Sequence, residues 1–202
     1  MSTAYGGNEI TFPDNSVQNT APRVGMINRI INGDMRIDQR NAGAAVASLG
    51  ATKTYIVDRF FYQSGNAGRF SAQQNAAAVT PPEGYTKYLG FTSLGANSPA
   101  ASDFGIASQS IEGLNTADFG WGTASAATIT ISFWVRSSIT GTQSIALVNL
   151  AGNRSYSQTY TINSANTWEQ KTITIPGDTT GTWLTDNTNG IMLRFALGTG
   201  SS

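Results

Sequence analysis

The clearest hydrophobic pattern in the chain is a strict alternation of apolar and polar residues from Thr128 to Arg136, TITISFWVR. One parity is apolar throughout: Ile129, Ile131, Phe133 and Val135. A period of two is typical of a half-buried β-strand, whereas an amphipathic helix repeats its apolar residues three and four apart. A second segment, Trp168 to Ile175 (WEQKTITI), alternates in the same way and ends at Pro176-Gly177. We expect these two segments to be central strands of a β-sandwich.

Shorter extended segments and turn signals recur along the rest of the chain. Met26 to Ile37 is predicted to be a strand interrupted at Asn32-Gly33, because Asn-Gly between apolar residues signals a hairpin or bulge. Further strands are predicted at 58–63, 69–75, 88–93, 104–111, 144–149, 155–162 and 191–196, and loops or turns at 41–51, 81–84, 114–122 and 138–142. A spacing of about ten residues between strands favours a β-sandwich or barrel, and no segment has a sustained helical period. The predicted fold class is therefore all-β.

Residues 1–25 differ from the remaining residues 26–202. Glycine and proline interrupt this segment repeatedly, and its only extended piece is Ile10 to Phe12. A segment of this kind cannot bury its own hydrophobic face, so we expect an extended segment that docks on the main domain, a sister chain or a larger particle. A disordered terminus is the alternative. The candidate docking and assembly residues are Ile10, Phe12, Val17 and Gln18.

Residues 26–202 are predicted to form one β-sandwich domain. The chain ends in Gly-Thr-Gly-Ser-Ser directly after a predicted strand. A sandwich normally closes its sheet with a returning terminal strand. We therefore expect this domain to be incomplete at its C-terminal end.

Composition excludes several kinds of chemistry. The chain has no cysteine and no histidine, which excludes disulfides, a thiol nucleophile, thiolate zinc sites and the commonest general base. Lysine plus arginine and aspartate plus glutamate number 12 each, so no net charge favours nucleic acid or an anionic membrane. The start lacks the features of a signal peptide, and no apolar run is long enough to insert in a membrane.

Charged residues make up 12% of the chain, against about 25% in typical domains. The polar surface must therefore consist mainly of serine, threonine, asparagine, glutamine and glycine. Such a surface offers neutral donors and acceptors that match sugar hydroxyls. It is equally typical of an extracellular or virion surface that avoids charge.

Two sets of acidic residues are candidates for catalysis or metal binding. Asp34 and Asp38 alternate with Arg36 and Arg40, which favours an ion ladder on one strand face over the carboxylate pair of a glycoside hydrolase. The loop from Asp178 to Asp186 is rich in oxygen ligands, but it lacks regular calcium-ligand spacing. We predict no catalytic residue, no metal site and no cofactor.

The tryptophans are the candidates for ligand or receptor contact. Trp121 and Trp183 lie in loops rich in glycine, threonine and aspartate, where binding residues concentrate. The alternative is that they plug the ends of the sandwich or a subunit contact. Trp134 has the parity opposite to Phe133, so it either packs under another layer or forms an exposed platform for a sugar ring. Trp168, at a strand start, is expected in the core.

Several long motifs resemble those of bacteriophage proteins. ITFPDNSVQNTA, from Ile10, resembles short segments of tail-fibre proteins. IINGDMRIDQRNAGA, TYIVDRFF, SAQQN, IEGLNTADFGWGTASAATITISFWVRSSITGT, NRSYSQTYTINSANTWEQKTITIPGDTTGTW and GIMLRFALGTGS resemble a domain of phage tail-fibre or virion structural proteins. This resemblance covers nearly all of residues 28–202. It implies a virion location and a homotrimeric fibre.

The layout is also similar to that of jelly-roll carbohydrate-binding modules. The shared features are an early Asn32-Gly33-Asp34, the ISFWV strand and the later NTW…TITIP strand. This similarity implies an antiparallel jelly-roll-like β-sandwich. Such modules often hold a structural calcium near the early motif, but Met35-Arg36 replaces their Phe-Glu, so the acidic ligand is missing here.

These observations together predict a non-enzymatic structural component of a phage particle. The leading hypothesis is a tail fibre whose N-terminal part attaches to the virion and whose sandwich acts as a spacer or host-surface adhesin. A capsid decoration or head-fibre protein, a glycan-binding module and a polysaccharide depolymerase are the alternatives. The expected partners are other tail or capsid proteins, two further copies of the chain in a homotrimer, and a host surface glycan. Neither nucleic acid nor membrane insertion is expected.

Overall fold

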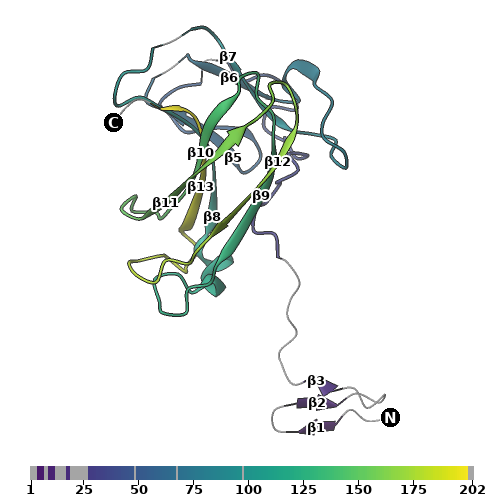
Figure 1. Ribbon diagram of the computed structural model, residues 1–202, viewed down its shortest axis with the longest axis vertical. Helices are drawn as coiled ribbons and strands as arrows, with labels where there is room; N and C mark the ends of the chain where they lie inside the picture. The colour runs from purple at the N-terminus through teal and green to yellow at the C-terminus, as the bar shows by residue number, and fades with distance from the viewer. Residues whose placement is uncertain are drawn as a thin grey trace.

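The computed structural model describes residues 4–6, 9–11, 17–18, 27–47, 49–66, 68–96 and 98–199 (Figure 1). The fold is all-β, as predicted, and its antiparallel sheets form a sandwich. Within the described ranges there is no α-helix, and the three 3₁₀ turns are η1 (Ala76–Ala78), η2 (Gly113–Asn115) and η3 (Ala117–Phe119). The strands are β1 (Ala4–Gly6), β2 (Glu9–Thr11), β3 (Val17–Gln18), β4 (Thr54–Val57), β5 (Phe60–Ser64), β6 (Phe70–Gln74), β7 (Leu89–Ser93), β8 (Phe104–Glu112), β9 (Ile129–Val135), β10 (Gly141–Val148), β11 (Ser155–Ile162), β12 (Glu169–Ile175) and β13 (Asn189–Thr199).

One layer of the sandwich is a six-stranded antiparallel sheet in the order β11-β10-β13-β8-β5-β4. Its centre is β13 and β8, which pair along most of their length with Leu193 opposite Gln109. Apolar residues of β13 alternate, and Ile191 and Leu193 are buried. β13 and β8 each have a strand partner on both sides, as do β10 and β5.

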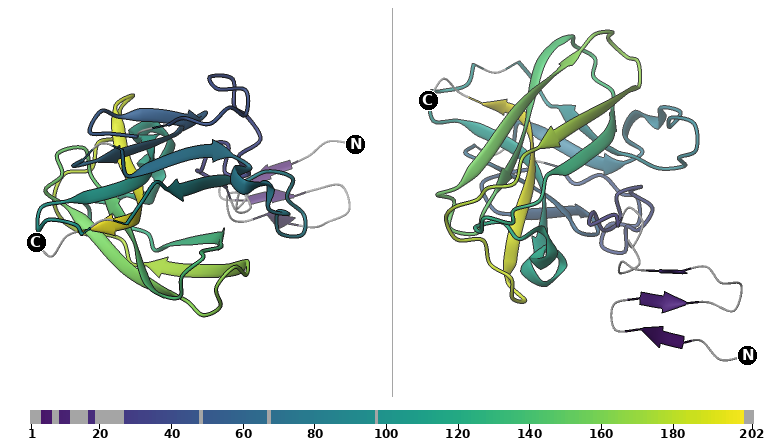
Figure 2. Two further views of the ribbon diagram at one scale, coloured as in Figure 1. Left: turned by 90° about the horizontal axis from the view of Figure 1, so that it is seen from above. Right: turned by 60° about the horizontal axis from the view of Figure 1, so that its bottom comes forward.

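The second layer is made of two separate hairpin-like pairs, β12-β9 and β6-β7 (Figure 2). The alternation predicted for the two most regular segments is confirmed, since β9 turns Thr130, Ser132 and Trp134 outward. Their predicted central position is wrong. Within the described strands, β9 and β12 pair only with each other, in a register that places Ile131 opposite Ile173. Alternation shows that a strand is half-buried, but it does not show how many neighbours the strand has.

The hydrophobic core between these layers has two clusters. The larger one joins β12 to β10 and β13 and includes Trp121 and Trp183 from the connecting loops. The smaller one surrounds Tyr62, which is fully buried and contacts the rings of Phe70 and Phe91 at centroid distances of 5.9 and 5.8 Å. The β12-β9 pair thus packs mainly on β10 and β13 of the six-stranded sheet, and the β6-β7 pair packs on β4 and β5.

The predicted strand from Met26 to Ile37 is not present in its described part, residues 27–37. A turn occupies residues 31–34 instead, with a hydrogen bond of 2.9 Å from the Met35 amide to the Asn32 carbonyl oxygen. The Asn32 side chain donates to the Ile37 and Asp58 carbonyl oxygens and accepts from the Ile37 amide. Asparagine at positive φ, 56° here, thus organises the turn that Asn32-Gly33 signals, while the flanking residues form a loop and not the predicted strand.

The described part of residues 1–25 consists of β1, β2 and β3, which form a three-stranded antiparallel sheet. In its register, Ile10 lies opposite Gln18 and Thr11 opposite Val17, so three of the four predicted docking residues come from paired strands. The fourth, Phe12, lies outside the described residues. The docking role of all four, and the division of the chain at residue 25, stay predictions.

Candidate functional site

Trp121 and Trp183 lie in the core at one end of the sandwich. Their exposed fractions are 6% and 9%, and their rings pack edge to face with centroids 4.8 Å apart. The Trp121 indole donates to the Ala127 carbonyl oxygen over 2.9 Å, and the Trp183 indole donates to Asp178 over 3.1 Å. Each ring is therefore packed and hydrogen-bonded inside the protein. Their predicted contact with a ligand stays a prediction, and the structure places both away from open surface.

Asp178 holds the loop beneath Trp183. Arg154 donates to both of its carboxylate oxygens over 2.8 and 2.7 Å, and the Thr180 amide donates to it as well. The Arg154 guanidinium is the main reason why the pKa of this carboxyl lies far below its ordinary value. The second acidic residue of this loop, Asp186, accepts instead from the Thr188 amide and hydroxyl. No group of acidic side chains able to hold a metal ion occurs among the described residues.

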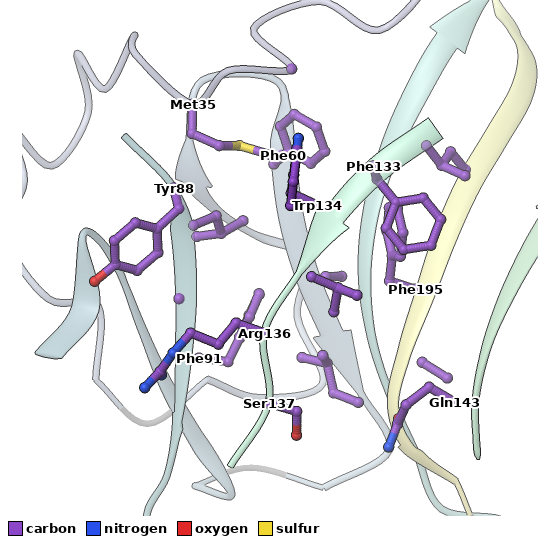
Figure 3. Close-up of a pocket in the computed structure, with 18 of the residues that line it drawn as sticks. Met35, Phe60, Tyr88, Phe91, Phe133, Trp134, Arg136, Ser137, Gln143 and Phe195 are labelled. Atoms are coloured by element: carbon purple, nitrogen blue, oxygen red, sulfur yellow. The ribbon is translucent and has the colours of Figure 1, made fainter. Parts of the chain in front are cut away.

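A groove of about 1700 Å³ opens in the second layer of the sandwich. One wall is β9, the other is β7, and the floor comes from β5, β8 and β13 of the six-stranded sheet. Figure 3 shows Trp134 and Phe133 on β9, Phe91 on β7 and Phe195 on β13 around this space. We call this feature the β7–β9 groove.

The inner face of β9 is less buried than its partner β12. Ile173 and Ile175 of β12 are 7% and 1% exposed. Ile131 and Ile129, which lie directly opposite them in the register, are only half-buried and line the groove. Because both pairs face the same core, the difference reflects the open space beside β9.

The groove is flanked by strand edges that lack a partner. Among the described strands, β9 pairs only with β12, and β7 pairs only with β6. Each strand therefore turns backbone N–H and C=O groups toward the groove. Exposed edges of this kind are ready to pair with another extended chain.

Aromatic side chains lie at the rim of the groove. Trp134 is 37% exposed on the outer face of β9, and its contact with a sugar ring stays a prediction. Trp168, which is predicted in the core, is only half-buried and lines the groove. Its ring packs edge to face on Tyr88 with centroids 5.5 Å apart, and its indole donates to the Thr80 carbonyl oxygen over 2.8 Å. This contact joins the β12-β9 pair to the loop before β7.

The carboxylates that line the groove are Asp34 and Asp103. Asp103 is an ion-pair partner of Arg69 at 2.5 Å and accepts from the Asn66 amide group, while Asp34 lies 3.8 Å from Arg36. The predicted ion ladder from Asp34 to Arg40 is wrong, because these residues lie in turns and coil rather than on a strand.

Asp38, which was expected in that ladder, stabilises a turn. Its carboxylate accepts from the Asn41 amide over 3.1 Å and from the Gly43 amide over 2.7 Å. A short acidic side chain that bonds backbone amides a few residues ahead is a common turn device. The acidic residues of this region are therefore explained by local backbone structure.

The groove can bind a chain-like molecule better than a compact one. Its volume exceeds the roughly 300 to 1000 Å³ of typical small-molecule pockets. Apolar floor residues, aromatic rings at the rim and two hydrogen-bonding edges suit an extended peptide or a glycan chain. In the sequence, only the parity of Trp134 indicated this site. A groove depends on which strands do not pair in the folded sheet, and a local pattern does not show this.

Comparison with solved structures shows a distant structural likeness. No protein-family model and no curated protein matches the chain. Among solved structures, it is similar to the enzymatically active domain of tailspike protein 4 of bacteriophage CBA120, with a TM-score of 0.40 and 16% sequence identity. The match covers 84% of this chain and 20% of that chain, so this chain spans about a fifth of its length. No helix in the described ranges is long and apolar enough to cross a membrane.

Proposed function

We propose that this protein is a non-enzymatic structural component of a phage particle, most specifically a tail fibre. Its N-terminal part attaches to the virion, and its β-sandwich serves as a spacer or host-surface adhesin. A homotrimer is the proposed assembly, because it would cover exposed strand edges and add the affinities of weak individual sites.

The observation that carries this proposal is the long resemblance of residues 28–202 to phage tail-fibre and virion domains. The resembling motifs fall on strands of one sandwich: ISFWV is the body of β9, WEQKTITIP is β12 with its flanks, and GIMLRFALGT is β13. The low charge and the wholly antiparallel sandwich are consistent with a rigid surface module.

Immunogold labelling of purified particles tests the proposal. An antibody against this chain is expected to label the tail, at the attachment point of its fibres. Label on the capsid would support the decoration or head-fibre alternative and contradict a tail fibre. A chain that is absent from particles of normal composition would contradict both forms of the proposal.

Glycan binding is the second candidate function, and the exposed rim of the β7–β9 groove favours it. Trp134 presents a ring of which 37% is accessible. Trp134→Ala is expected to weaken binding to host polysaccharide at least tenfold by calorimetry, since stacking on the ring would be lost. Leu150→Ala is the matched control, because Leu150 is 48% exposed and lies outside the groove. Equal binding by both variants would contradict a glycan site at Trp134.

An assay for polysaccharide cleavage tests whether the protein is non-enzymatic. A depolymerase needs two carboxyl groups about 5 to 9 Å apart across the scissile bond. Incubation of the protein with host polysaccharide is expected to release no new reducing ends. Release that is abolished by Asp103→Asn, but not by Asp118→Asn outside the groove, would contradict this expectation.

A further inference from the structure

The two edges of the six-stranded sheet differ in how they are protected. At one edge, β4 has four residues and an irregular register with β5. The Asn41 side chain donates to the Ile56 and Tyr55 carbonyl oxygens, and the Lys53 amine lies 4.0 Å from the centre of the Phe61 ring. A short, bulged strand that is covered by a loop and flanked by lysine is well protected against pairing with another chain.

The opposite edge, β11, has none of these features. It has eight residues, Ser155–Ile162, all in regular register with β10. Its sequence SYSQTYTI contains no charged residue, no proline and no glycine. In the described chain, β10 is its only strand partner, and Figure 1 shows it at the lateral edge of the sandwich. A long, regular, uncharged edge can pair with another strand.

The sequence of β11 is a palindrome of side-chain types about Gln158. Moving outward from this residue in both directions, the chain has a hydroxyl residue, then tyrosine, then a hydroxyl residue. These positions are Ser157 and Thr159, Tyr156 and Tyr160, and Ser155 and Thr161. An antiparallel pair of identical strands related by a two-fold axis at Gln158 would place like side-chain types opposite each other.

The side chains of β11 also alternate between the two faces of the sheet in a way that is compatible with such pairing. Tyr156 and Gln158 lie opposite Leu147 and Ile145 of β10, so both have the parity of the core face; Tyr156 packs against the core, and Gln158 is exposed. Tyr160 has the same parity, its ring contacts Phe133 at a centroid distance of 5.1 Å, and burial raises its pKa to about 12. A partner strand centred on Gln158 would keep aromatic residues on the core side and hydroxyl residues on the outside.

We propose that β11 pairs with β11 of a second copy of this chain, antiparallel, with the two-fold axis at Gln158. The six-stranded sheet then continues across the axis into that of the second copy. Tyr156 of each copy lies opposite Tyr160 of the other, and cross-strand aromatic pairs stabilise antiparallel sheets. Neither strand carries a charge that would oppose this contact. Because the contact is isologous, with the same surface used by both copies, it joins two copies and then stops.

Cysteine crosslinking tests the register directly, because the chain has no cysteine of its own. Directly opposite residues of an antiparallel pair have Cα atoms about 4.5 to 5.5 Å apart, within the range of a disulfide. Gln158→Cys in the full chain is expected to give mainly a two-chain band on a non-reducing denaturing gel after mild oxidation. Thr161→Cys is the control, since its two copies would be roughly 20 Å apart. Equal crosslinking of both variants, or none by Gln158→Cys, would overturn the proposal.

A charge at the axis provides the second test. Gln158→Lys places two lysines opposite each other, whereas Gln170→Lys puts the same change on an exposed position of β12. By light scattering, Gln158→Lys is expected to halve the mass of the assembly, and Gln170→Lys to leave it unchanged. If residues 1–25 hold three chains together, the parent assembly contains six chains and the Gln158→Lys variant contains three. The mass therefore distinguishes the contact through β11 from the contact through residues 1–25. An unchanged mass for Gln158→Lys would contradict the pairing of β11.

Discussion

The two halves of the sandwich have the same layered plan but different degrees of closure. In the closed half, β12 and the loop tryptophans pack on β10 and β13, and Ile175 is 1% exposed. In the open half, β9 and β7 approach the same six-stranded sheet without pairing, and they leave the β7–β9 groove between them. Closure of a sandwich therefore depends on contiguous strands in both layers, and not only on the supply of apolar side chains.

The largest expected effect comes from the closed half. Trp121→Ala removes a buried ring that packs on Trp183 and is expected to lower the free energy of unfolding by about 3 to 5 kcal/mol. Trp134→Ala, in the open half, is expected to cost less than about 1 kcal/mol, because its ring is already partly in water. Urea unfolding measures both values. Similar costs for the two variants would show that the halves do not differ in closure.

The backbone packing of the closed half gives the next effect. A Cβ atom on Gly190 would lie 2.6 Å from the Cα of Gly113 and 2.9 Å from the Leu184 carbonyl oxygen. Gly190→Ala is expected to cost about 1 to 3 kcal/mol, because backbone atoms would have to shift. Gly95 has no atom within 4 Å of such a Cβ, so Gly95→Ala should be neutral or stabilise by up to about 1 kcal/mol. Thermal unfolding of both variants checks this; a neutral Gly190→Ala would contradict tight packing there.

Replacing isoleucine by the larger phenylalanine compares the packing of the two halves at neighbouring positions. Ile131 and Ile173 lie directly opposite each other on β9 and β12. Ile173→Phe is expected to cost about 1 to 3 kcal/mol, because its 7% exposed site has no room for a ring. Ile131→Phe should cost under about 1 kcal/mol, since the ring can extend into the groove. Equal losses in the free energy of unfolding, measured in urea, would show that Ile131 and Ile173 are equally tightly packed.

The smallest effect is the response of the closed half to acid. Arg154 holds the pKa of Asp178 well below its ordinary value of 3.8. A lowered folded-state pKa contributes stability above pH 3.8, and this contribution is lost as pH falls from there toward the folded-state pKa. Asp178→Asn should therefore be less stable than the parent chain at neutral pH and lose less stability on acidification. Parallel slopes of stability against pH for the two proteins would contradict this.

The sequence predicted the strands well where one face of a strand is buried and the other is exposed. β9 and β12 alternate because each has one apolar face and one exposed face, and this information is local. β4 was missed, because a strand of four residues carries too little alternation to be recognised. The segment around Asn32 forms a loop rather than the predicted strand, because the asparagine side chain bonds the Ile37 backbone in both directions. The turn signal at Asn32-Gly33 is confirmed.

The candidate site was less predictable than the fold. Trp121 and Trp183 lie in loops rich in glycine and aspartate, and such loops usually suggest surface. Here these loops fold over the end of the sandwich and bury both rings. The β7–β9 groove arises from the absence of pairing between strands that are far apart in the sequence, and no local pattern encodes it.

The second layer is open between β9 and β7, and residue-resolved hydrogen exchange of the isolated chain tests this openness most directly. We predict strong protection along β8, which has partners on both sides, and fast exchange of alternate amides along β9, whose remaining amides bond to β12. Uniform protection along the whole of β9 and β7, equal to that of β8, would show that the groove is closed and would contradict the account.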